Sequence, residues 1–521
     1  MAGMPDKKSQ NPEEELQPRQ KPFPFHPLLI GLYPFLALLG ANLGQVNPVL
    51  TLRALLASLV VVLLVFFLLR RLVKDPDKAS LLAAWLLLLF FTYGHAYTLL
   101  EGKALFGMLL GRHLVLAPVW AVLAAGVGYL ILRTKAPLQP ATRILNIIAV
   151  LLAALALVRI GAYFLTNTPD RTEVQLKQPV QAPSEALPDV YYIILDAYSR
   201  PDMLEEHHNL DVTAFVQELE SLGFVFPACT QSNYSITALS LASSLNMDYV
   251  EQIAPQIVQQ NINWGAFSDY IVHSEVRKQF EALGYRFVTF ETGIPWDEMP
   301  DAGLYLARKK SALHQMLNFR QITEFEMLYL RTTALRLADE LRSSAGYTLA
   351  DEVQSPQQDH YERILFVLDE LDNSAAVPGP KFVFLHLMAP HGPWVLGEDG
   401  SYTYTDNEME GYARSVKYLN QRIPGILGSI LANSEHPPVI ILQGDHGFLN
   451  EERLAILNAY HLPGGSDGAL YPAVSPVNTF RIIFNEYFGA SYELLPDRSF
   501  LSDRDDPYNF SPVEYPCVSQ P

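Results

Sequence analysis

The chain has 521 residues, of which 49% are hydrophobic and 18% charged, and its mean hydropathy is +0.11. This composition is too apolar for a disordered protein and poor in charge for an ordinary soluble enzyme, while the length suggests about three domains at roughly 150 residues each. Residues 1–172 hold 16 Lys and Arg against 8 Asp and Glu, whereas the remainder holds 21 against 47. So acidic a C-terminal part excludes nucleic acid as a partner, because affinity for DNA or RNA depends on cations that neutralise phosphates.

A polar tail at 1–26 precedes five apolar runs. A helix needs about 20 apolar residues to cross the roughly 30 Å hydrocarbon core of a bilayer, so we expect a transmembrane domain of about five helices within 27–165. The runs carry no polar stripe of the kind that a helix of a soluble protein shows. The tail is rich in Pro and Glu, so the first run is not a cleavable signal peptide. The expected spans are 27–44, 54–69, 79–99, 114–132 and 144–165.

Basic residues in the short loops predict the orientation of these spans, because cytoplasmic loops carry an excess of Lys and Arg. The excess lies in the tail, the second loop and the fourth loop, so five crossings leave the C-terminal part outside. We therefore expect a multi-pass protein of the plasma (inner) membrane with an extracytoplasmic domain, as part of the cell envelope. The residues are Lys7, Lys8, Arg19 and Lys21 in the tail, Arg70, Arg71, Lys74 and Lys78 in the second loop, and Arg133, Lys135 and Arg143 in the fourth.

After a linker rich in Pro, Gln and Ser at 166–188, residues 189–521 have the pattern of an α/β domain. Continuous apolar runs rich in β-branched or aromatic residues are typical of strands buried on both faces, as in a parallel sheet. Their alternation with helical stretches predicts a mostly parallel sheet flanked by helices. The expected strands are 190–195, 286–290, 381–387 and 438–443, and the expected helices are 212–223, 266–284, 357–372 and 407–433.

The two cysteines, Cys229 and Cys517, lie in this expected outer domain. An extracytoplasmic location permits a disulfide between them. Two cysteines 288 positions apart do not require one, so both the paired and the unpaired state stay open.

The ends of the expected strands carry groups that bind metals. Asp196 ends the first strand, and Asp445 and His446 follow the last one within Gly444-Asp-His-Gly447. Ligands of open parallel sheets bind outside the carboxyl ends of the strands. A strand-terminal Asp is also a common helix N-cap, so each residue alone is a weak signal. Together, two carboxylates and an imidazole predict a site for one divalent ion: zinc, manganese or magnesium.

A hydroxyl-rich stretch at 231–246 runs into a helix expected to begin near Thr237. Backbone N–H groups and the helix dipole at such a position attract a phosphoryl group. A threonine hydroxyl is a weak nucleophile at pH 7, and metal coordination activates it. The alternative interpretation is an N-cap in front of a packed Ser/Ala-rich helix, and this stretch alone leaves both open.

The order of Asp196, Thr237, a Pro390-His-Gly-Pro393 segment and the Asp-His-Gly segment resembles the alkaline phosphatase/sulfatase superfamily. With several spans ahead of the domain, the chain is most similar to lipoteichoic acid synthase and the phosphoethanolamine transferases, over residues 188–490. The resemblance implies that Asp196, Thr237, Asp445 and His446 hold the catalytic metal. It also implies that Thr237 is the nucleophile and that His391 contacts the phosphoryl oxygens or the leaving group.

Two departures from the family pattern narrow the expected activity. The stretch Thr237-Ala-Leu-Ser240 lacks the Cys or Ser that sulfatases oxidise, and the Arg of their motif, which disfavours an arylsulfatase. Phosphoethanolamine transferases have a further His about a dozen residues after Asp-His-Gly, whereas His461 here comes later, in an expected strand. We therefore expect a single ion, as in lipoteichoic acid synthase. His386, inside an expected buried strand, is given a structural role.

The expected function is a membrane-bound, metal-dependent transferase acting through a phospho-Thr intermediate. It moves a phosphoglycerol or phosphoethanolamine substituent from a phospholipid donor to an extracytoplasmic glycan or lipid acceptor. One alternative is a membrane-anchored sulfatase-like or phosphodiester hydrolase of the same superfamily. Another, of a different class, is a catalytically inactive membrane-tethered binding domain, which would have no need of a metal-activated hydroxyl.

Overall fold

The computed structural model describes residues 23–43, 46, 51–105, 108–166, 187–261, 264–308, 323–337, 356–449 and 452–514. The chain divides into two compact units. Of the described residues, the first unit contains those up to Ala41, Thr51–Ala162 and those from Glu326 to 337. The second unit contains the others, mainly those from Tyr163 to Phe325 and from 356 onward. The described residues leave out most of the polar tail and most of the linker expected at 166–188. They also leave out Cys517, so the predicted alternatives for Cys229 and Cys517 are not tested.

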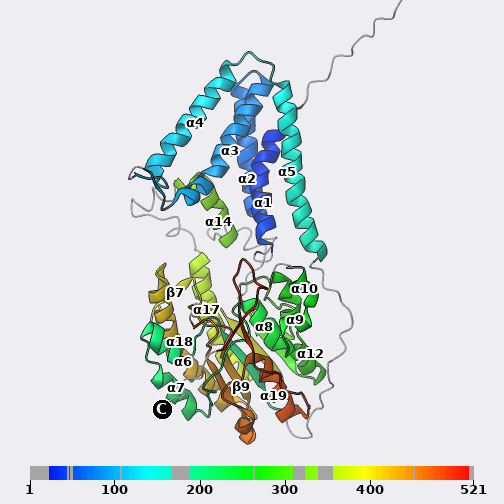
Figure 1. The fold of residues 1–521 in the computed structure, drawn as a ribbon, viewed down its shortest axis with the longest axis vertical. Coiled ribbons are helices and arrows are strands. Elements are labelled where there is room, and N and C mark those ends of the chain that lie inside the picture. The colour runs from blue at the N-terminus through cyan, green and yellow to red at the C-terminus, as the bar shows by residue number, and fades with distance from the viewer. Residues whose placement is uncertain are drawn as a thin grey trace, which may run out of the picture. The chain divides into compact units, whose positions relative to one another are not determined.

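The first unit is helical, and each of the five expected apolar runs lies mainly in one of its helices (Figure 1). Four of these helices are long and apolar enough to cross a membrane, and a fifth, at the N-terminal end, is apolar but shorter. The expected membrane domain of about five helices is thus confirmed, with one helix below spanning length. The helices are α1 (His26–Asn42), α2 (Leu52–Leu72), α3 (Pro76–Leu100), α4 (His113–Arg133) and α5 (Gln139–Thr166), and a short hairpin of β1 (Ala104–Leu105) and β2 (Met108–Leu109) precedes α4.

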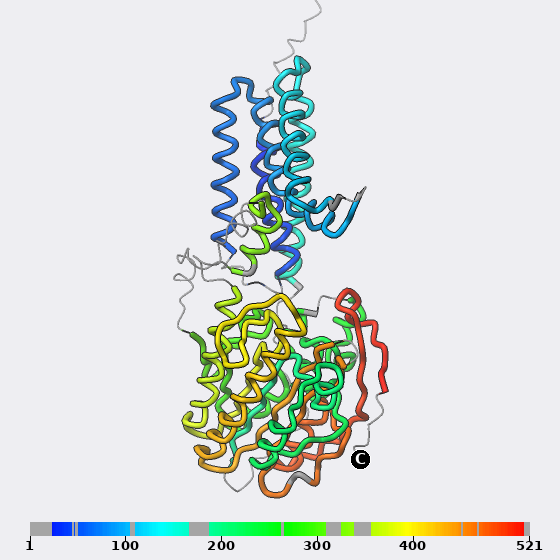
Figure 2. The backbone as a smooth tube through the Cα atoms, turned by 90° about the vertical axis from the view of Figure 1, so that its left-hand side faces the viewer, coloured from blue at the N-terminus to red at the C-terminus, as the bar shows by residue number. Residues whose placement is uncertain are grey.

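A segment from much further along the chain also belongs to the helical unit. Helix α14 (Glu324–Thr332), drawn in green, lies among the blue helices (Figure 2). The Ser58 hydroxyl donates a hydrogen bond to the Tyr329 hydroxyl oxygen at 2.8 Å, and the Ala334 N–H donates to the Phe90 carbonyl at 2.8 Å. A Cβ on Gly94 would lie 2.0 Å from the Arg331 carbonyl oxygen, so only glycine allows this approach. The region expected as one domain at 189–521 is therefore interrupted by residues that cluster with the membrane helices.

The second unit is built on a six-stranded sheet in the order β10-β9-β3-β6-β4-β5. Its strands are parallel except β10, which pairs antiparallel with β9 at one edge. This confirms the expected α/β domain with a mostly parallel sheet. The strands are β3 (Val190–Leu195), β4 (Arg286–Phe290), β5 (Leu304–Leu306), β6 (Lys381–Leu387), β9 (Val439–Gly444) and β10 (Asn458–His461), with two-stranded sheets of β7 (Trp394–Leu396) with β8 (Tyr402–Thr405) and β11 (Ser499–Leu501) with β12 (Ser511–Val513).

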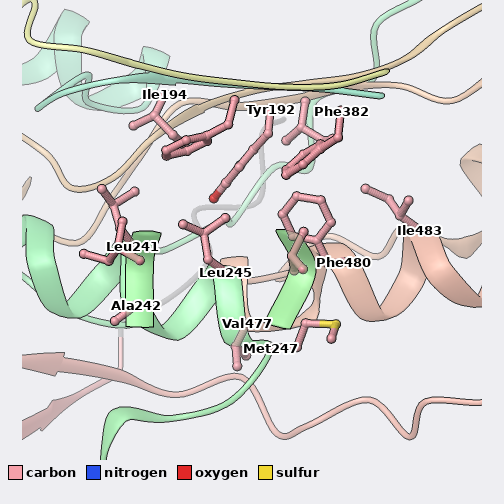
Figure 3. Packing of buried hydrophobic residues seen from close by; sticks show 14 of the residues in the cluster. Tyr192, Ile194, Leu241, Ala242, Leu245, Met247, Phe382, Val477, Phe480 and Ile483 are labelled. Carbon is pink, nitrogen blue, oxygen red and sulfur yellow. The ribbon is translucent and has the colours of Figure 1, made fainter. Parts of the chain in front are cut away.

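Helices cover both faces of this sheet, because alternate side chains of its strands point to opposite sides. On one face, Tyr192 and Ile194 of β3 and Phe382 of β6 pack against α8 and α19, as Figure 3 shows. On the other, Tyr191 and Ile193 pack against α7, α17 and α18. The helices of this unit are α6 (Pro201–His208), α7 (Thr213–Ser221), α8 (Thr237–Asn246), α9 (Val250–Ile253), α10 (Pro255–Gln259), α11 (Ser268–Val272), α12 (Glu275–Ala282), α17 (Pro356–Asn373), α18 (Glu408–Asn433) and α19 (Pro476–Phe488), with 3-10 turns at Trp264–Phe267, Ser374–Ala376 and Pro463–Ala469.

The helix expected at 266–284 is wrong as a single element. It is divided into α11 and α12 at His273 and Ser274. Ser274 is the N-cap of α12, and its hydroxyl accepts a hydrogen bond from the Arg277 N–H. A serine cap satisfies an amide at a helix start, so the polar residue inside the apparent helical pattern begins a new helix.

Candidate metal centre

The carboxyl ends of β3 and β9 bring the first two candidate ligands together. In the parallel register, Leu195 lies opposite Gly444 of β9, so Asp196 and Asp445 leave adjacent strands at the same level. The Ala197 N–H donates a hydrogen bond to Asp445 Oδ1 at 2.9 Å. A Cβ on Gly444 would lie 2.3 Å from the Tyr198 carbonyl oxygen, so the glycine before Asp445 permits the close crossing of the two strand ends.

His446 completes a compact cluster with these two carboxylates. One ligand atom from each of Asp196, Asp445 and His446 lies within 4.8 Å of the others, and all three residues are buried. His446 Nε2 is 3.3 Å from Asp445 Oδ2 and 3.7 Å from Asp196 Oδ1. Among the described residues, this is the one group of three or more His, Cys, Asp or Glu side chains with ligand atoms so close.

Thr237 is the first residue of α8, and its hydroxyl faces the cluster. Thr237 Oγ1 lies 3.1 Å from His446 Nε2. The N-cap of α8 is Ile236, so the hydroxyl of Thr237 does not serve as the cap. One turn later, Ser240 Oγ donates to the Asp445 carbonyl oxygen at 2.8 Å and ties α8 to the end of β9. Thr237 is partly exposed as a residue, whereas Asp196, Asp445 and His446 are buried.

His391 lies beside the same cluster, on the segment that follows β6. Its N–H donates to the Asp196 carbonyl oxygen at 3.1 Å, and its ring centroid is 6.5 Å from that of His446. Its Nδ1 is 2.7 Å from the Gly392 carbonyl oxygen, an acceptor that requires Nδ1 to carry the proton. The structure therefore brings five predicted site residues together at the carboxyl ends of the central strands: Asp196, Thr237, His391, Asp445 and His446.

The chemistry of this donor set fits one divalent ion. Asp196 Oδ1 and Asp445 Oδ2 are buried and have no hydrogen-bond partner among the described residues, which is costly for a carboxylate oxygen. His446 Nδ1 is 2.9 Å from the Gly447 carbonyl oxygen, so Nδ1 donates and the Nε2 lone pair faces the carboxylates. Ligands of a tetrahedral ion at bond lengths of about 2.0–2.2 Å lie about 3.3–3.6 Å apart, close to the spacings around His446 Nε2.

The two carboxyl groups of the cluster have pKa values shifted in opposite directions. Burial, and then the charge of Asp196, raise the pKa of Asp445 to about 6. Burial also acts to raise the pKa of Asp196, but the charge of His391 and the contacts with His386 and His446 outweigh it and hold that pKa below its ordinary value. Burial, and then the charge of Arg453, lower the pKa of His446, so its imidazole is neutral, as a metal ligand must be.

Two residues that lie next to the cluster, His386 and Asp297, were not predicted from the sequence as neighbours of the candidate ligands. His386 Nδ1 is hydrogen-bonded to Asp297 Oδ2 at 2.5 Å, and its Nε2 lies 3.3 Å from Asp196 Oδ2. Sequence reasoning gave His386 only a structural role and did not single out Asp297. The register of β6 against β3 is the feature that could have indicated the contact of His386 with Asp196, because His386 pairs with Ile194, two residues before Asp196.

Arg453 was also missed, although it follows Asp-His-Gly closely. Its Nη2 lies 3.0 Å from His446 Nε2, and its Nε donates to the Ser235 carbonyl oxygen at 2.9 Å. His461 is elsewhere: it pairs with Ile440 on β9, and its Nδ1 is 2.8 Å from the Pro438 carbonyl oxygen before that strand. It is thus at the opposite end of β9 from the cluster.

Comparison with known proteins gives matches among solved structures alone. No protein-family model matches the chain, and no curated protein matches it. The chain is similar to the integral membrane lipooligosaccharide phosphoethanolamine transferase A (EptA) from Neisseria meningitidis, with 12% identity and a TM-score of 0.38 over 87% of this chain and 94% of that one. It is similar to the C-terminal periplasmic domain of EcEptC from Escherichia coli, with 12% identity and a TM-score of 0.38 over 63% and 94%.

A third neighbour is the phosphonate monoester hydrolase of Agrobacterium radiobacter, with 12% identity and a TM-score of 0.34 over 60% of this chain and 80% of that one. These structural neighbours carry the names of phosphoethanolamine transferases and of a hydrolase. Likeness at this identity and score says nothing of activity, because one fold hosts many functions. The function is therefore argued from the side chains of this chain.

Proposed function

We propose that the chain is a membrane-bound, metal-dependent transferase that moves a phospho-substituent from a phospholipid to an extracytoplasmic glycan or lipid acceptor. The substituent is of the phosphoglycerol or phosphoethanolamine type. The observation that carries the proposal is the hydroxyl of the partly exposed Thr237, which lies 3.1 Å from His446 Nε2. It lies beside a buried cluster whose two carboxylates each keep an oxygen with no hydrogen-bond partner among the described residues. A binding domain has no use for a hydroxyl placed in this way.

Asp196, Asp445, His446 and Thr237 would hold one zinc, manganese or magnesium ion. When bound, such an ion lowers the pKa of a hydroxyl that it contacts and offsets negative charge on a phosphoryl group. The chain prepares the donors: the Gly447 carbonyl fixes the tautomer of His446, and the Ala197 N–H orients the Asp445 carboxylate.

Thr237 would then attack the phosphorus of the lipid headgroup. The bond between Thr237 Oγ1 and phosphorus forms, the bond to the lipid alcohol breaks, and a phospho-threonine remains. The hydroxyl proton leaves to solvent, and His391 gives a proton to the departing alcohol oxygen. Backbone N–H groups in the first turn of α8 support the negative charge on the phosphoryl oxygens. An acceptor hydroxyl then attacks the phospho-threonine and gives its proton to His391. The bond between phosphorus and Thr237 Oγ1 breaks, and Thr237 regains a proton from solvent.

The helical unit supports a lipid donor. Its four helices of spanning length and composition would keep the chain in the bilayer that contains the phospholipid, which replaces a three-dimensional search by a two-dimensional one. The excess of Lys and Arg in the tail and in the second and fourth loops supports a cytoplasmic N-terminus in a plasma (inner) membrane, with the α/β unit outside.

The test uses the full chain in vesicles that contain headgroup-labelled phosphatidylethanolamine or phosphatidylglycerol, with glycan and lipid acceptors added. We expect diacylglycerol release and labelled acceptor with zinc or manganese present, and loss of both after chelation. Thr237→Ala should abolish the reaction, whereas Thr213→Ala, at the equivalent first position of α7, should not change it.

The remaining outcomes separate the alternatives. Release of the headgroup to water with every acceptor left unlabelled would identify a hydrolase. Turnover of Thr237→Ala equal to that of the unchanged protein would show that the nucleophile is another residue. Absence of any reaction, with metal bound, would favour the binding domain.

A further inference from the structure

We infer that Arg453 holds an oxygen of the phosphoryl group during transfer and makes the site selective for substrates with a single negative charge. This inference deepens the proposed function and rests on it. It assigns a substrate-binding role to a residue that lies outside the predicted ligand set, and it names the charge class of the substrate as a phosphodiester monoanion.

Two of the three guanidinium nitrogens of Arg453 are used to fix its plane. Its Nε donates to the Ser235 carbonyl oxygen at 2.9 Å, and its Nη1 donates to the Gly447 carbonyl oxygen at 3.1 Å. Ser235 lies just before α8, and Gly447 follows the candidate ligand His446. The guanidinium therefore bridges the two segments that carry the nucleophile and the imidazole, and these two hydrogen bonds set its orientation.

The third nitrogen, Nη2, points into the cluster. It lies 3.0 Å from His446 Nε2, the atom that is also 3.1 Å from Thr237 Oγ1. Among the described residues Nη2 has no other hydrogen-bond acceptor. The lone pair of His446 Nε2 is the one that an ion would take, so metal binding would leave the Nη2 donors without an acceptor beside the attacking hydroxyl. A phosphoryl oxygen would supply the missing acceptor.

The charges around Arg453 give the expected substrate class. Within the described part of the chain, Arg453 makes no ion pair with a carboxylate, and it is the one Lys or Arg side chain hydrogen-bonded to the cluster. A divalent ion would offset the two charges of Asp196 and Asp445, which leaves the guanidinium charge as the one positive side chain of Lys or Arg that is hydrogen-bonded to the cluster within the described residues. A phosphodiester carries one negative charge and neutralises it, whereas a phosphomonoester dianion leaves one negative charge uncompensated in a buried site.

Guanidinium geometry suits this task. Its planar fork matches two oxygens of a phosphate group, and hydrogen bonds to ionised groups are the stronger ones. Two other arginines of the unit are paired with carboxylates: Arg200 binds Asp202 through two nitrogens, and Arg422 binds Asp369 at the surface. Arg422 therefore serves as a matched control.

The experiment measures binding rather than turnover. Zinc-loaded full chain is titrated at pH 8 with dimethyl phosphate, a monoanion, and with methyl phosphate, a dianion. We expect the unchanged protein to bind the monoanion more tightly, Arg453→Gln to weaken that binding roughly 10-fold to 100-fold, and Arg422→Gln to leave it unchanged. Arg453→Lys, which keeps the charge but not the fork, should fall between. Zinc affinity of Arg453→Gln should be equal or higher, because a competitor for the His446 lone pair is gone.

Two results would overturn the inference. One is equal dimethyl phosphate affinity in Arg453→Gln and the unchanged protein. The other is loss of zinc affinity in both Arg453 variants, which would show that the guanidinium only holds the loops together. Failure of the proposed function is distinct: it would appear as absence of headgroup transfer by the unchanged protein even while anion binding depends on Arg453.

Discussion

Thr237 Oγ1 lies 3.1 Å from His446 Nε2, although 209 positions separate the two residues in the chain. One is at the start of α8 and the other just beyond β9, and the hydrogen bond from Ser240 to the Asp445 carbonyl holds these two elements together. The fold therefore holds the two groups in place through a contact between their elements as well as through the two side chains. Such preorganisation lowers the cost of assembling the reacting groups.

Replacing either buried carboxylate should weaken metal binding, and replacing Asp445 should do so without destabilising the metal-free protein. We expect Asp445→Asn and Asp196→Asn to weaken zinc binding roughly 100-fold or more, because each removes a charged ligand. The metal-free Asp445→Asn variant should unfold at an equal or higher temperature than the metal-free parent, because one of two adjacent buried charges is gone. Thermal unfolding with and without zinc measures both effects, and Asp211→Asn, an exposed carboxylate, is the control. Unchanged zinc affinity in Asp445→Asn would contradict the ligand assignment.

Asp297 should act on the metal through His386. Its carboxylate is hydrogen-bonded to His386 Nδ1, and His386 Nε2 contacts the Asp196 carboxylate. Partners of this kind orient a ligand, and their loss typically costs 10-fold to 100-fold in metal affinity. We expect Asp297→Asn to weaken zinc binding by about that factor while the protein stays folded, as measured by chelator competition and circular dichroism. Zinc affinity equal to that of the parent would show that this pair is only part of the core.

Zinc should stabilise the protein more at pH 7 than at pH 5. The pKa of Asp445 is raised from 3.8 to about 6 by burial and then by the charge of Asp196. Because the folded-state pKa is the higher one, this carboxyl contributes stability that is fully present below about pH 4 and is lost as the pH rises through about 6. A divalent ion would bind the ionised Asp445 carboxylate, so it would restore this stability only at a pH at which Asp445 has lost its proton.

The measurement is the shift of the unfolding temperature on zinc addition at the two pH values. The difference between the shifts should shrink in Asp445→Asn, whose amide does not titrate. A larger shift at pH 5 than at pH 7 in the parent protein would have the wrong sign.

In the helical unit, an ion pair ties α14 to α2. Arg53 Nε donates to Glu326 Oε1 at 2.6 Å, a second nitrogen binds the other carboxylate oxygen, and the two side chains are only 14% and 9% exposed. Breaking a buried pair on one side removes a counter-charge from the remaining group and typically costs about 3–5 kcal/mol. We expect Arg53→Met and Glu326→Met each to destabilise this unit by about that amount in detergent unfolding, and the double variant by less than either single one. Additive losses would contradict the coupling.

Much of the α/β fold was predictable, because its determinants are local. The strands at Val190–Leu195 and Lys381–Leu387 are continuous apolar runs, and a sheet buried on both faces requires such runs. Parallel strands place their carboxyl ends on the same side of the sheet, so the sequence predicts that Asp196 and Asp445 lie together. The helix start at Thr237 followed from the change in composition there.

What sequence did not predict depends on tertiary register. His386 looks like any buried strand residue, and its contact with Asp196 arises from the pairing of β6 with β3. Asp297 and Arg453 come from irregular segments, where no periodicity predicts the direction of a side chain. Helix α14 is only nine residues long, too short for a membrane pattern, so its place among the membrane helices had no signal in hydropathy.

The most direct test of the central claim is mass spectrometry of the trapped enzyme. Zinc-loaded protein is incubated with headgroup-labelled phospholipid in the absence of acceptor, quenched in acid and digested. The account predicts a phosphoethanolamine or phosphoglycerol adduct on the peptide that contains Thr237, absent after chelation and in Thr237→Ala. An adduct on another residue, or full headgroup transfer by Thr237→Ala, would contradict it.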